Sequence, residues 1–186
     1  IIIDLPGQGG SDRYLDNPHK RHSLGFDALL QDLHSLIDEI VLSASIDAEN
    51  NHVRLPMILF GHSLGGHLAL RYLAEYNKTS RGSTIFSAAA ITAPMLGIKP
   101  VDRLPKIVSW PYLSYLSLFP TAYVPGGCNW TPEFRDRIGL KGIFSHDPVR
   151  SQIQAAYFTH PDYKHLAIGS PTNKWLLDAL KSCRLV

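Results

Sequence analysis

A serine flanked by glycines lies between a continuous apolar run and a segment whose apolar residues recur at helical spacing. This arrangement limits the fold more than any other feature. Residues 57–60 form a continuous apolar run, which predicts a strand buried on both faces. After Ser63, apolar residues recur at helical spacing up to Asn77. Residues 61–65 between them match G-x-S-x-G, a sharp strand-to-helix turn that exposes a serine hydroxyl. We therefore predict a strand, a turn and a helix, with Ser63 as a nucleophile.

The pattern G-x-S-x-G is weak on its own. Its three fixed positions, here Gly61, Ser63 and Gly65, match by chance in roughly 6% of chains of this length. The context strengthens it, because an apolar strand ends at Gly61 and an amphipathic helix begins after Ser63. A glycine turn without chemistry is the alternative. His62 lies inside the turn, and its side chain is expected to point away from that of Ser63.

Attack by a serine on an acyl carbonyl creates an oxyanion, and the backbone N–H of Leu64 at a helix N-terminus is predicted to stabilise it. The serine also needs a histidine base and an acid that orients the histidine. Downstream candidates are Asp147 or Asp162 with His160 or His165. These segments are explained more simply as loops and helix starts, with Asp147 as an N-cap before a proline.

The other histidines and the two cysteines do not predict a metal site. His67 lies on the helix after the turn and is not expected to act as the base. Four further histidines have no acidic or cysteine companions at ligand spacing: His19, His22, His34 and His52. Cys128 and Cys183 lie far apart and are expected to be free thiols. We expect no metal and no organic cofactor.

The first half of the chain predicts an α/β layer. Residues 1–4 are a β-branched run that predicts a strand before a glycine-rich turn. Residues 26–41 carry apolar side chains at steps of three and four, which predicts a helix. Residues 85–92 predict a third buried strand. The order strand, helix, strand, helix, strand indicates a parallel sheet.

The second half of the chain differs from the first in its proline content and its hydrophobic pattern. Prolines are frequent from Met95 to Phe134, so long regular elements are not expected there. The apolar, aromatic run at 107–119 has two interpretations, core packing or an apolar lid over the serine. Pro148 is expected to open a helix through Tyr157, and Pro171 a helix through Leu180.

Composition limits the partners. The 186 residues carry a net charge of +2, which does not favour a nucleic-acid surface. Apolar residues make up 45% and charged residues 18%, enough for one sizeable core. No apolar stretch is long enough to predict a transmembrane helix. The chain opens at Ile1 without a methionine, which suggests that it begins inside a longer protein, so no signal peptide is predicted or excluded.

Several segments together resemble one branch of the α/β-hydrolases, the lysophospholipase and monoacylglycerol lipase-like branch, also classed with the serine aminopeptidase S33 family. Residues 4–11 are similar to its D-x-R-G-x-G-x-S loop, with Pro6 where arginine is usual. The remaining similar segments are 26–33, the turn at 58–66, 92–97, 147–150 and 169–175. The resemblance thus covers nearly the whole chain.

The resemblance implies a partial α/β-hydrolase fold, a mostly parallel sheet with flanking helices and an inserted helical cap. Residues 1–97 would form the partial core with the nucleophile turn, and residues 98–186 the cap or lid region. The family order places the acid and the histidine of the triad beyond Val186 and the second oxyanion donor before Ile1. By this resemblance the chain is an internal fragment, and the isolated piece is expected to be inactive and of low stability.

The resemblance also implies a function. We expect a serine hydrolase of carboxylic esters, similar to lysophospholipases or monoacylglycerol lipases, that forms an acyl-enzyme on Ser63. The alternatives are an aminopeptidase or an acyltransferase on the same fold, or a non-catalytic α/β-hydrolase-like binding module. The expected partner is a small lipid or ester substrate, with peripheral membrane contact and no nucleic acid. The expected location is the cytoplasm or the periphery of the inner membrane.

Overall fold

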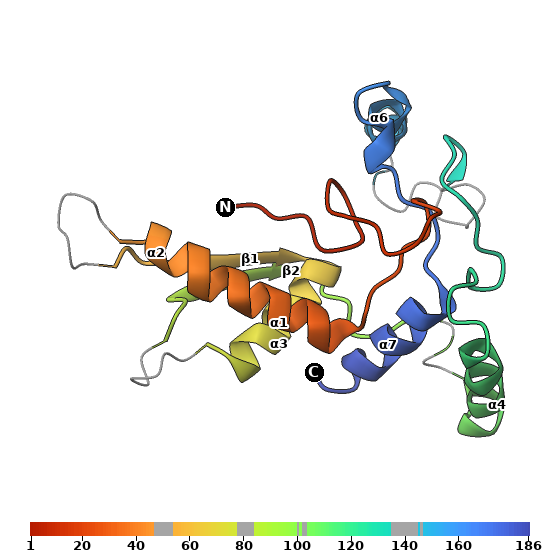
Figure 1. Ribbon diagram of the computed structural model, residues 1–186, viewed down its shortest axis with the longest axis horizontal. Coiled ribbons are helices and arrows are strands. Elements are labelled where there is room, and N and C mark those ends of the chain that lie inside the picture. The colour runs from red at the N-terminus through yellow and green to blue at the C-terminus, as the bar shows by residue number, and fades with distance from the viewer. Residues whose placement is uncertain (47–53, 78–83, 100, 102–103, 135–144, 146) are drawn as a thin grey trace. The chain divides into compact units, whose positions relative to one another are not determined.

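Two compact units make up the chain. The computed structural model describes residues 1–46, 54–77, 84–99, 101, 104–134, 145 and 147–186 (Figure 1). The first unit consists of Ile1, Gly25–Pro105 and Asp178–Val186, and the second of Ile2–Leu24 and Lys106–Leu177. Both units therefore combine segments that are distant in the sequence. The expected division into residues 1–97 and 98–186 stays a prediction.

A small parallel sheet forms the centre of the first unit. Strand β1 (Ile58–His62) pairs in parallel with β2 (Ala88–Thr92), so that Ile58 lies opposite Ala88 and His62 opposite Thr92. The predictions of strands within 57–60 and 85–92 and of a parallel arrangement are confirmed, but the burial expected for the later strand is wrong, because every residue of β2 except the half-buried Ile91 is exposed. Both strands run toward the same edge, where Ser63 follows β1 directly.

Helices flank this sheet. Helix α3 (Leu64–Glu75) begins immediately after Ser63 and contacts both strands. Helix α1 (Phe26–Leu36) packs against α3 and continues into a π-helical segment, η1 (Ile37–Val41), and the short α2 (Leu42–Ala44). The predicted helical segment at 26–41 is thus confirmed. The buried cluster between these elements consists of Leu30, Ile37, Tyr72, Ile85 and Phe86.

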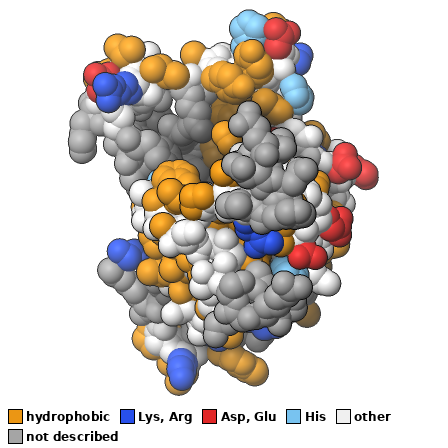
Figure 2. Space-filling model, turned by 90° about the vertical axis from the view of Figure 1, so that its left-hand side faces the viewer, with side chains coloured by type: hydrophobic (Ala, Val, Ile, Leu, Met, Phe, Trp, Pro, Cys, Tyr) orange, Lys and Arg blue, Asp and Glu red, His pale blue; other side chains and the backbone are white. Residues whose placement is uncertain are grey.

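The helices of this unit bury only one side of β1. Leu59 packs against the buried cluster, whereas its neighbours Ile58 and Phe60 are 69% and 68% exposed. Successive strand residues point to opposite faces, so this alternation marks one covered and one uncovered face. The prediction that the strand at 57–60 is buried on both faces is therefore wrong for the described residues. Hydrophobic side chains also reach the surface at several places on the face drawn in Figure 2.

Residues 1–4 form no strand, contrary to expectation. Ile2 is 99% exposed, and none of the described residues pairs with this segment as a strand. A β-branched run favours extended backbone, but a strand also needs a neighbour that completes its hydrogen bonds. The segment instead bends into a loop, in which Asp4 Oδ2 accepts a bond of 2.9 Å from the N–H of Gly10. The Ser11 hydroxyl donates to the Asp4 carbonyl at 2.8 Å.

In the second unit, backbone pairing joins two distant segments. The N–H of Arg21 donates to Ser170, and the carbonyl of Arg21 accepts from Thr172. Beneath this bridge the buried His22 ring shares a hydrogen bond of 2.9 Å with the Thr172 hydroxyl through Nδ1. These bonds hold residues 21–22 against residues 170–172, the segment that precedes α7 (Asn173–Cys183).

The described residues of this unit include three longer helices. Helix α4 spans Lys106–Ser117, α6 spans Pro148–Thr159, and α7 spans Asn173–Cys183, although its residues from Asp178 onward belong to the first unit. A short 3₁₀ turn, η3, lies at Lys164–Leu166. The helices predicted after Pro148 and Pro171 are confirmed, the second of them beginning at Asn173.

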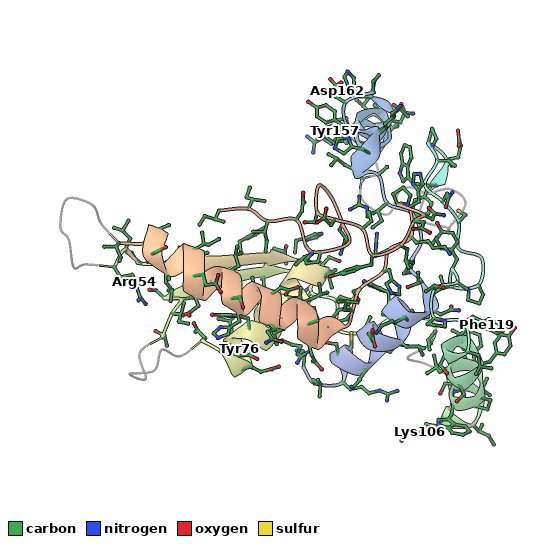
Figure 3. The ribbon with its side chains drawn as sticks, in the orientation of Figure 1. Arg54, Tyr76, Lys106, Phe119, Tyr157 and Asp162 are labelled. Carbon is green, nitrogen blue, oxygen red and sulfur yellow. The ribbon has the colours of Figure 1, made fainter. Side chains whose placement is uncertain are left out.

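Helix α4 contradicts the expectation that prolines exclude long elements here. It contains Pro111, which removes one backbone donor and crowds the preceding turn, at a cost of about 3 kcal/mol. One such residue leaves the remaining backbone bonds of the helix intact. Figure 3 labels Lys106, the first residue of α4, and Phe119, which lies two residues after its end.

The apolar run at 107–119 lies mostly at the surface. Leu116 is buried, but Ile107 and Trp110 are 84% and 74% exposed. Because most of this run is exposed, it does not pack into a core formed by the described residues. The interpretation as core packing is therefore excluded for most of the run. Among the described helices, none combines the length and apolar character required to cross a membrane.

Candidate active site

Ser63 adopts the strained backbone that the G-x-S-x-G turn requires. Its φ and ψ are 52° and −114°. Such a conformation costs a non-glycine residue on the order of 1–3 kcal/mol. Ser63 occupies the N-cap position of α3, yet its side chain makes no capping bond and the residue is exposed. Its hydroxyl is therefore not used to cap the helix, and the residue is open to solvent.

Three backbone hydrogen bonds hold this strained residue. The N–H of Ser63 donates to the carbonyl of Thr92, at the end of β2, at 3.0 Å. The carbonyl of Ser63 accepts two bonds of 3.0 Å, from the N–H of His67 in α3 and from the N–H of Met95. The turn is thus fixed both by the helix that follows it and by the segment after the neighbouring strand.

The glycines around the turn differ in their steric role. A Cβ at Gly61 would lie 2.6 Å from the carbonyl oxygen of Gly65, closer than real Cβ atoms approach backbone. A Cβ at Gly66 would lie 3.2 Å from both Ile91 and Pro94. A Cβ at Gly65 would meet no described atom within 4 Å. Gly66, which the motif does not include, therefore packs the helix against β2; the doubled glycine was its only signal in the sequence.

Leu64 is the first residue of α3. The N–H groups in the first turn of an α-helix have no partner within the helix, and the helix dipole adds partial positive charge there. The Leu64 N–H directly follows the serine and is available to a developing oxyanion. Its catalytic role stays a prediction.

His62 and His67 lie on either side of the nucleophile in the sequence. His62 is exposed and its Nδ1 lies 2.9 Å from the hydroxyl of Thr92. His67 is fully buried, and its Nε2 lies 2.7 Å from the hydroxyl of Ser182. Both rings are therefore bound to hydroxyl groups of other residues.

Asp147 is an N-cap, as the simpler interpretation predicts. Its Oδ1 accepts hydrogen bonds of 2.8 and 3.0 Å from the N–H groups of Val149 and Arg150. These bonds satisfy two of the free donors at the start of α6.

The other triad candidates lie near the end of α6, on exposed side chains. His160 Nδ1 is 3.7 Å from Asp162 Oδ2, and His165 is part of η3. Asp162 and Tyr157 label this region in Figure 3. Asp147 and these three residues belong to the second unit, whereas Ser63 belongs to the first. The structure therefore does not identify an acid and base for Ser63, and the placement of both beyond residue 186 stays a prediction.

Potential metal ligands do not gather in the described part of the chain. No group of three or more histidine, cysteine or acidic side chains lies close enough there to hold an ion. No disulfide joins Cys128 and Cys183, both of which are described.

His67 gives the first unit a sensitivity to acid. Burial lowers the pKa of its ring below 6.5, and the Arg71 cation lowers it further, against the opposing effect of the Met95 carbonyl. A histidine with a lowered pKa in the folded state contributes stability that is present above pH 6.5 and is lost as the pH falls through the folded pKa. We therefore expect the free energy of unfolding to fall between about pH 7.5 and pH 5.

Denaturant titration of the full-length protein and of two variants checks this expectation. His67→Gln should flatten the fall in stability with acid. His165→Gln, which changes an exposed histidine, should leave it unchanged. Equal pH dependence of the wild type and His67→Gln would contradict the assignment.

Comparisons with known proteins agree with this geometry. Residues 1–183 match the family described as serine aminopeptidase, S33. Lysophospholipase L2 of Escherichia coli K12 and its counterpart in strain O6:H1 are each 26% identical over 180 residues. These residues make up 97% of this chain but 47% of each relative, so the chain spans about half the length of the curated relatives it matches.

A solved structure shows the same fold. The monoacylglycerol lipase of Paleococcus ferrophilus aligns with a TM-score of 0.53 and 18% identity, over 98% of this chain and 53% of that chain. This confirms the expected α/β-hydrolase fold class. Together with the match over residues 1–183, it assigns the chain to the serine aminopeptidase S33 family of α/β-hydrolases.

Proposed function

We propose that the protein containing this chain hydrolyses carboxylic esters and that Ser63 forms the acyl-enzyme. The supporting observation is the strained, exposed Ser63 at the junction of β1 and α3. A backbone N–H at the start of α3 directly follows it. A nucleophile and an oxyanion donor held on rigid elements are two of the parts that acyl transfer requires.

The reaction has two halves. The Ser63 oxygen attacks the ester carbonyl while a base accepts the hydroxyl proton, and the Leu64 N–H stabilises the oxyanion. Collapse of this intermediate breaks the bond to the alcohol, which leaves with a proton. Water then attacks the acyl-serine and releases the carboxylic acid. The base and its orienting acid are assigned, by the family resemblance alone, to residues after 186.

A monoacyl glycerolipid or a lysophospholipid is the proposed substrate class. Lysophospholipase L2 and the monoacylglycerol lipase bear the names of enzymes for such lipids. The family name favours the second candidate, an aminopeptidase that uses the same serine.

A fluorophosphonate probe tests the proposal on the full-length protein. We expect labelling of the wild type and none of Ser63→Ala, because the probe reacts with an activated serine hydroxyl. Hydrolysis of a monoacylglycerol or an aryl ester, compared with an aminoacyl arylamide, separates the lipase from the aminopeptidase. Absence of both labelling and turnover would favour a non-catalytic binding module.

A further inference from the structure

Helix α3 carries a stripe of polar side chains that leads away from the nucleophile. Ser63, His67, Arg71 and Glu75 are four residues apart, so they share one side of the helix and its N-cap. His67 is 0% and Arg71 5% exposed. Burying such groups is unfavourable unless each finds a hydrogen-bond partner. The hydrogen-bond partners of His67 and Arg71 therefore indicate which elements the stripe connects to α3.

Ser182, near the end of α7, is the shared partner at the centre of the stripe. Its hydroxyl lies 2.7 Å from His67 Nε2 and accepts a hydrogen bond of 3.1 Å from Arg71 Nη1. Ser182 is itself 2% exposed. A single hydroxyl thus joins two successive turns of α3 to the end of α7, the part of that helix that belongs to the same unit.

The outer end of the stripe is tied to α1 and to α3 itself. Arg71 Nη1 lies 2.8 Å from Asp27, and Arg71 Nη2 lies 2.9 Å from Glu75. Both carboxylates are exposed, so these ion pairs contribute little stability on their own. They do fix the guanidinium, and through it the position of the Ser182 hydroxyl.

The residue after Ser182 contacts the other support of the turn. The Cys183 sulfur lies 3.4 Å from the carbonyl of Met95, within reach of a weak hydrogen bond. His67 and Met95 are the two residues whose N–H groups donate to the carbonyl of Ser63. Both backbone donors to the strained serine therefore belong to residues that contact the last turn of α7.

We propose that Ser182 is a positioning residue for the nucleophile. Its hydroxyl fixes His67, hence the first turn of α3 and the Leu64 N–H. The inference rests on the proposed function, because what is positioned is the acyl-transfer machinery. A strained residue keeps its conformation only where its surroundings over-determine it, and a displacement of about 1 Å is enough to slow catalysis about 10²-fold.

The test compares Ser182→Ala with a matched control in the full-length protein. We expect Ser182→Ala to lower kcat for an aryl ester about tenfold, equivalent to 1.4 kcal/mol, with KM changed less than about twofold. Ser182→Thr, which keeps the hydroxyl, should recover most of the lost kcat. Ser45→Ala removes a buried hydroxyl from the same unit, one that donates to Leu42 at 2.7 Å, and should leave kcat unchanged.

Amide hydrogen exchange supplies a readout that does not depend on activity. Exchange of the amides at 64–67 should accelerate in Ser182→Ala and stay unchanged in Ser45→Ala. An unchanged kcat together with unchanged exchange would overturn the inference, and so would an equal loss of kcat in Ser45→Ala. A wild type without esterase activity would refute the proposed function alone, since exchange would still decide whether Ser182 holds the turn.

A third variant covers the case in which Ser182→Ala fails to fold. Cys183→Ala removes the weak contact between the Cys183 sulfur and the Met95 carbonyl. A severalfold fall in kcat with an unchanged KM is then expected. An unchanged kcat together with unchanged amide exchange at 64–67 in this variant would show that the last turn of α7 does not hold the turn at Ser63, and would overturn the inference.

Discussion

Replacing Ser63 by alanine in the full-length protein is expected to lower kcat for ester hydrolysis about 10⁶-fold. The substitution removes the oxygen that attacks the carbonyl and leaves the oxyanion donor in place. Residual activity on the order of 10³-fold over the uncatalysed reaction should remain from binding and the oxyanion site. Steady-state kinetics with an aryl ester measure both quantities.

Substrate binding and folding serve as controls for this experiment. The side chain of Ser63 is exposed and does not cap α3, so its loss should change the melting temperature little. A non-hydrolysable substrate analogue should bind the variant with nearly wild-type affinity. Retention of more than about a tenth of the wild-type kcat would show that Ser63 is not the nucleophile.

Gly61→Ala is expected to have the second largest effect. The added Cβ would lie 2.6 Å from the Gly65 carbonyl oxygen and 2.9 Å from the Gly66 Cα, so the turn must shift to accommodate it. Overpacking of this kind costs about 1–3 kcal/mol of stability. A displacement of about 1 Å at the nucleophile lowers kcat about 10²-fold. Thermal melting and ester kinetics measure the two effects separately.

Gly65→Ala is the matched control for stability, since its Cβ would meet no described atom within 4 Å. Alanine is also the better helix former by about 1 kcal/mol, so this variant should melt at or above the wild-type temperature. Equal losses of stability in the two variants would show that the close approach at Gly61 does not constrain the turn.

The sequence predicted the centre of the first unit because local signals there agree. The apolar run of β1, the glycine motif and the helical period of α3 each indicate one structure, and all three elements formed within a few residues of the expected bounds. Asp147 was predictable as a cap for the same reason, since a short acceptor before a proline at a helix start has a local function.

The failed predictions concern features that depend on distant partners. The strand expected at residues 1–4 requires a neighbouring strand, and the burial expected for Ile58 and Phe60 requires cover on the second face of the sheet. The hydrophobic pattern indicates which residues favour burial, but it does not indicate which segment of the chain will cover them. Helix α4 forms despite Pro111, which removes one backbone donor and leaves the other positions of the helix able to bond.

The candidate site was predictable only where its chemistry is local. Ser63 and Leu64 are adjacent and share one motif, whereas an acid and a base can be supplied from any distance along the chain. The contact between His67 and Ser182 spans 115 positions. Neither residue type nor spacing indicates such a pair, so it emerged only from the structure.

The uncovered face of β1 and β2 has a practical consequence for handling this polypeptide. In the described part of the chain β1 and β2 pair only with each other, so their outer edges, beside exposed side chains such as Ile58 and Phe60, are a template on which further copies can assemble through backbone pairing. Aggregation, rather than loss of the strand-to-helix turn at Ser63, would then govern how the 186-residue species behaves at high concentration. Biophysical work on the nucleophile is therefore better done in dilute samples of the full-length protein.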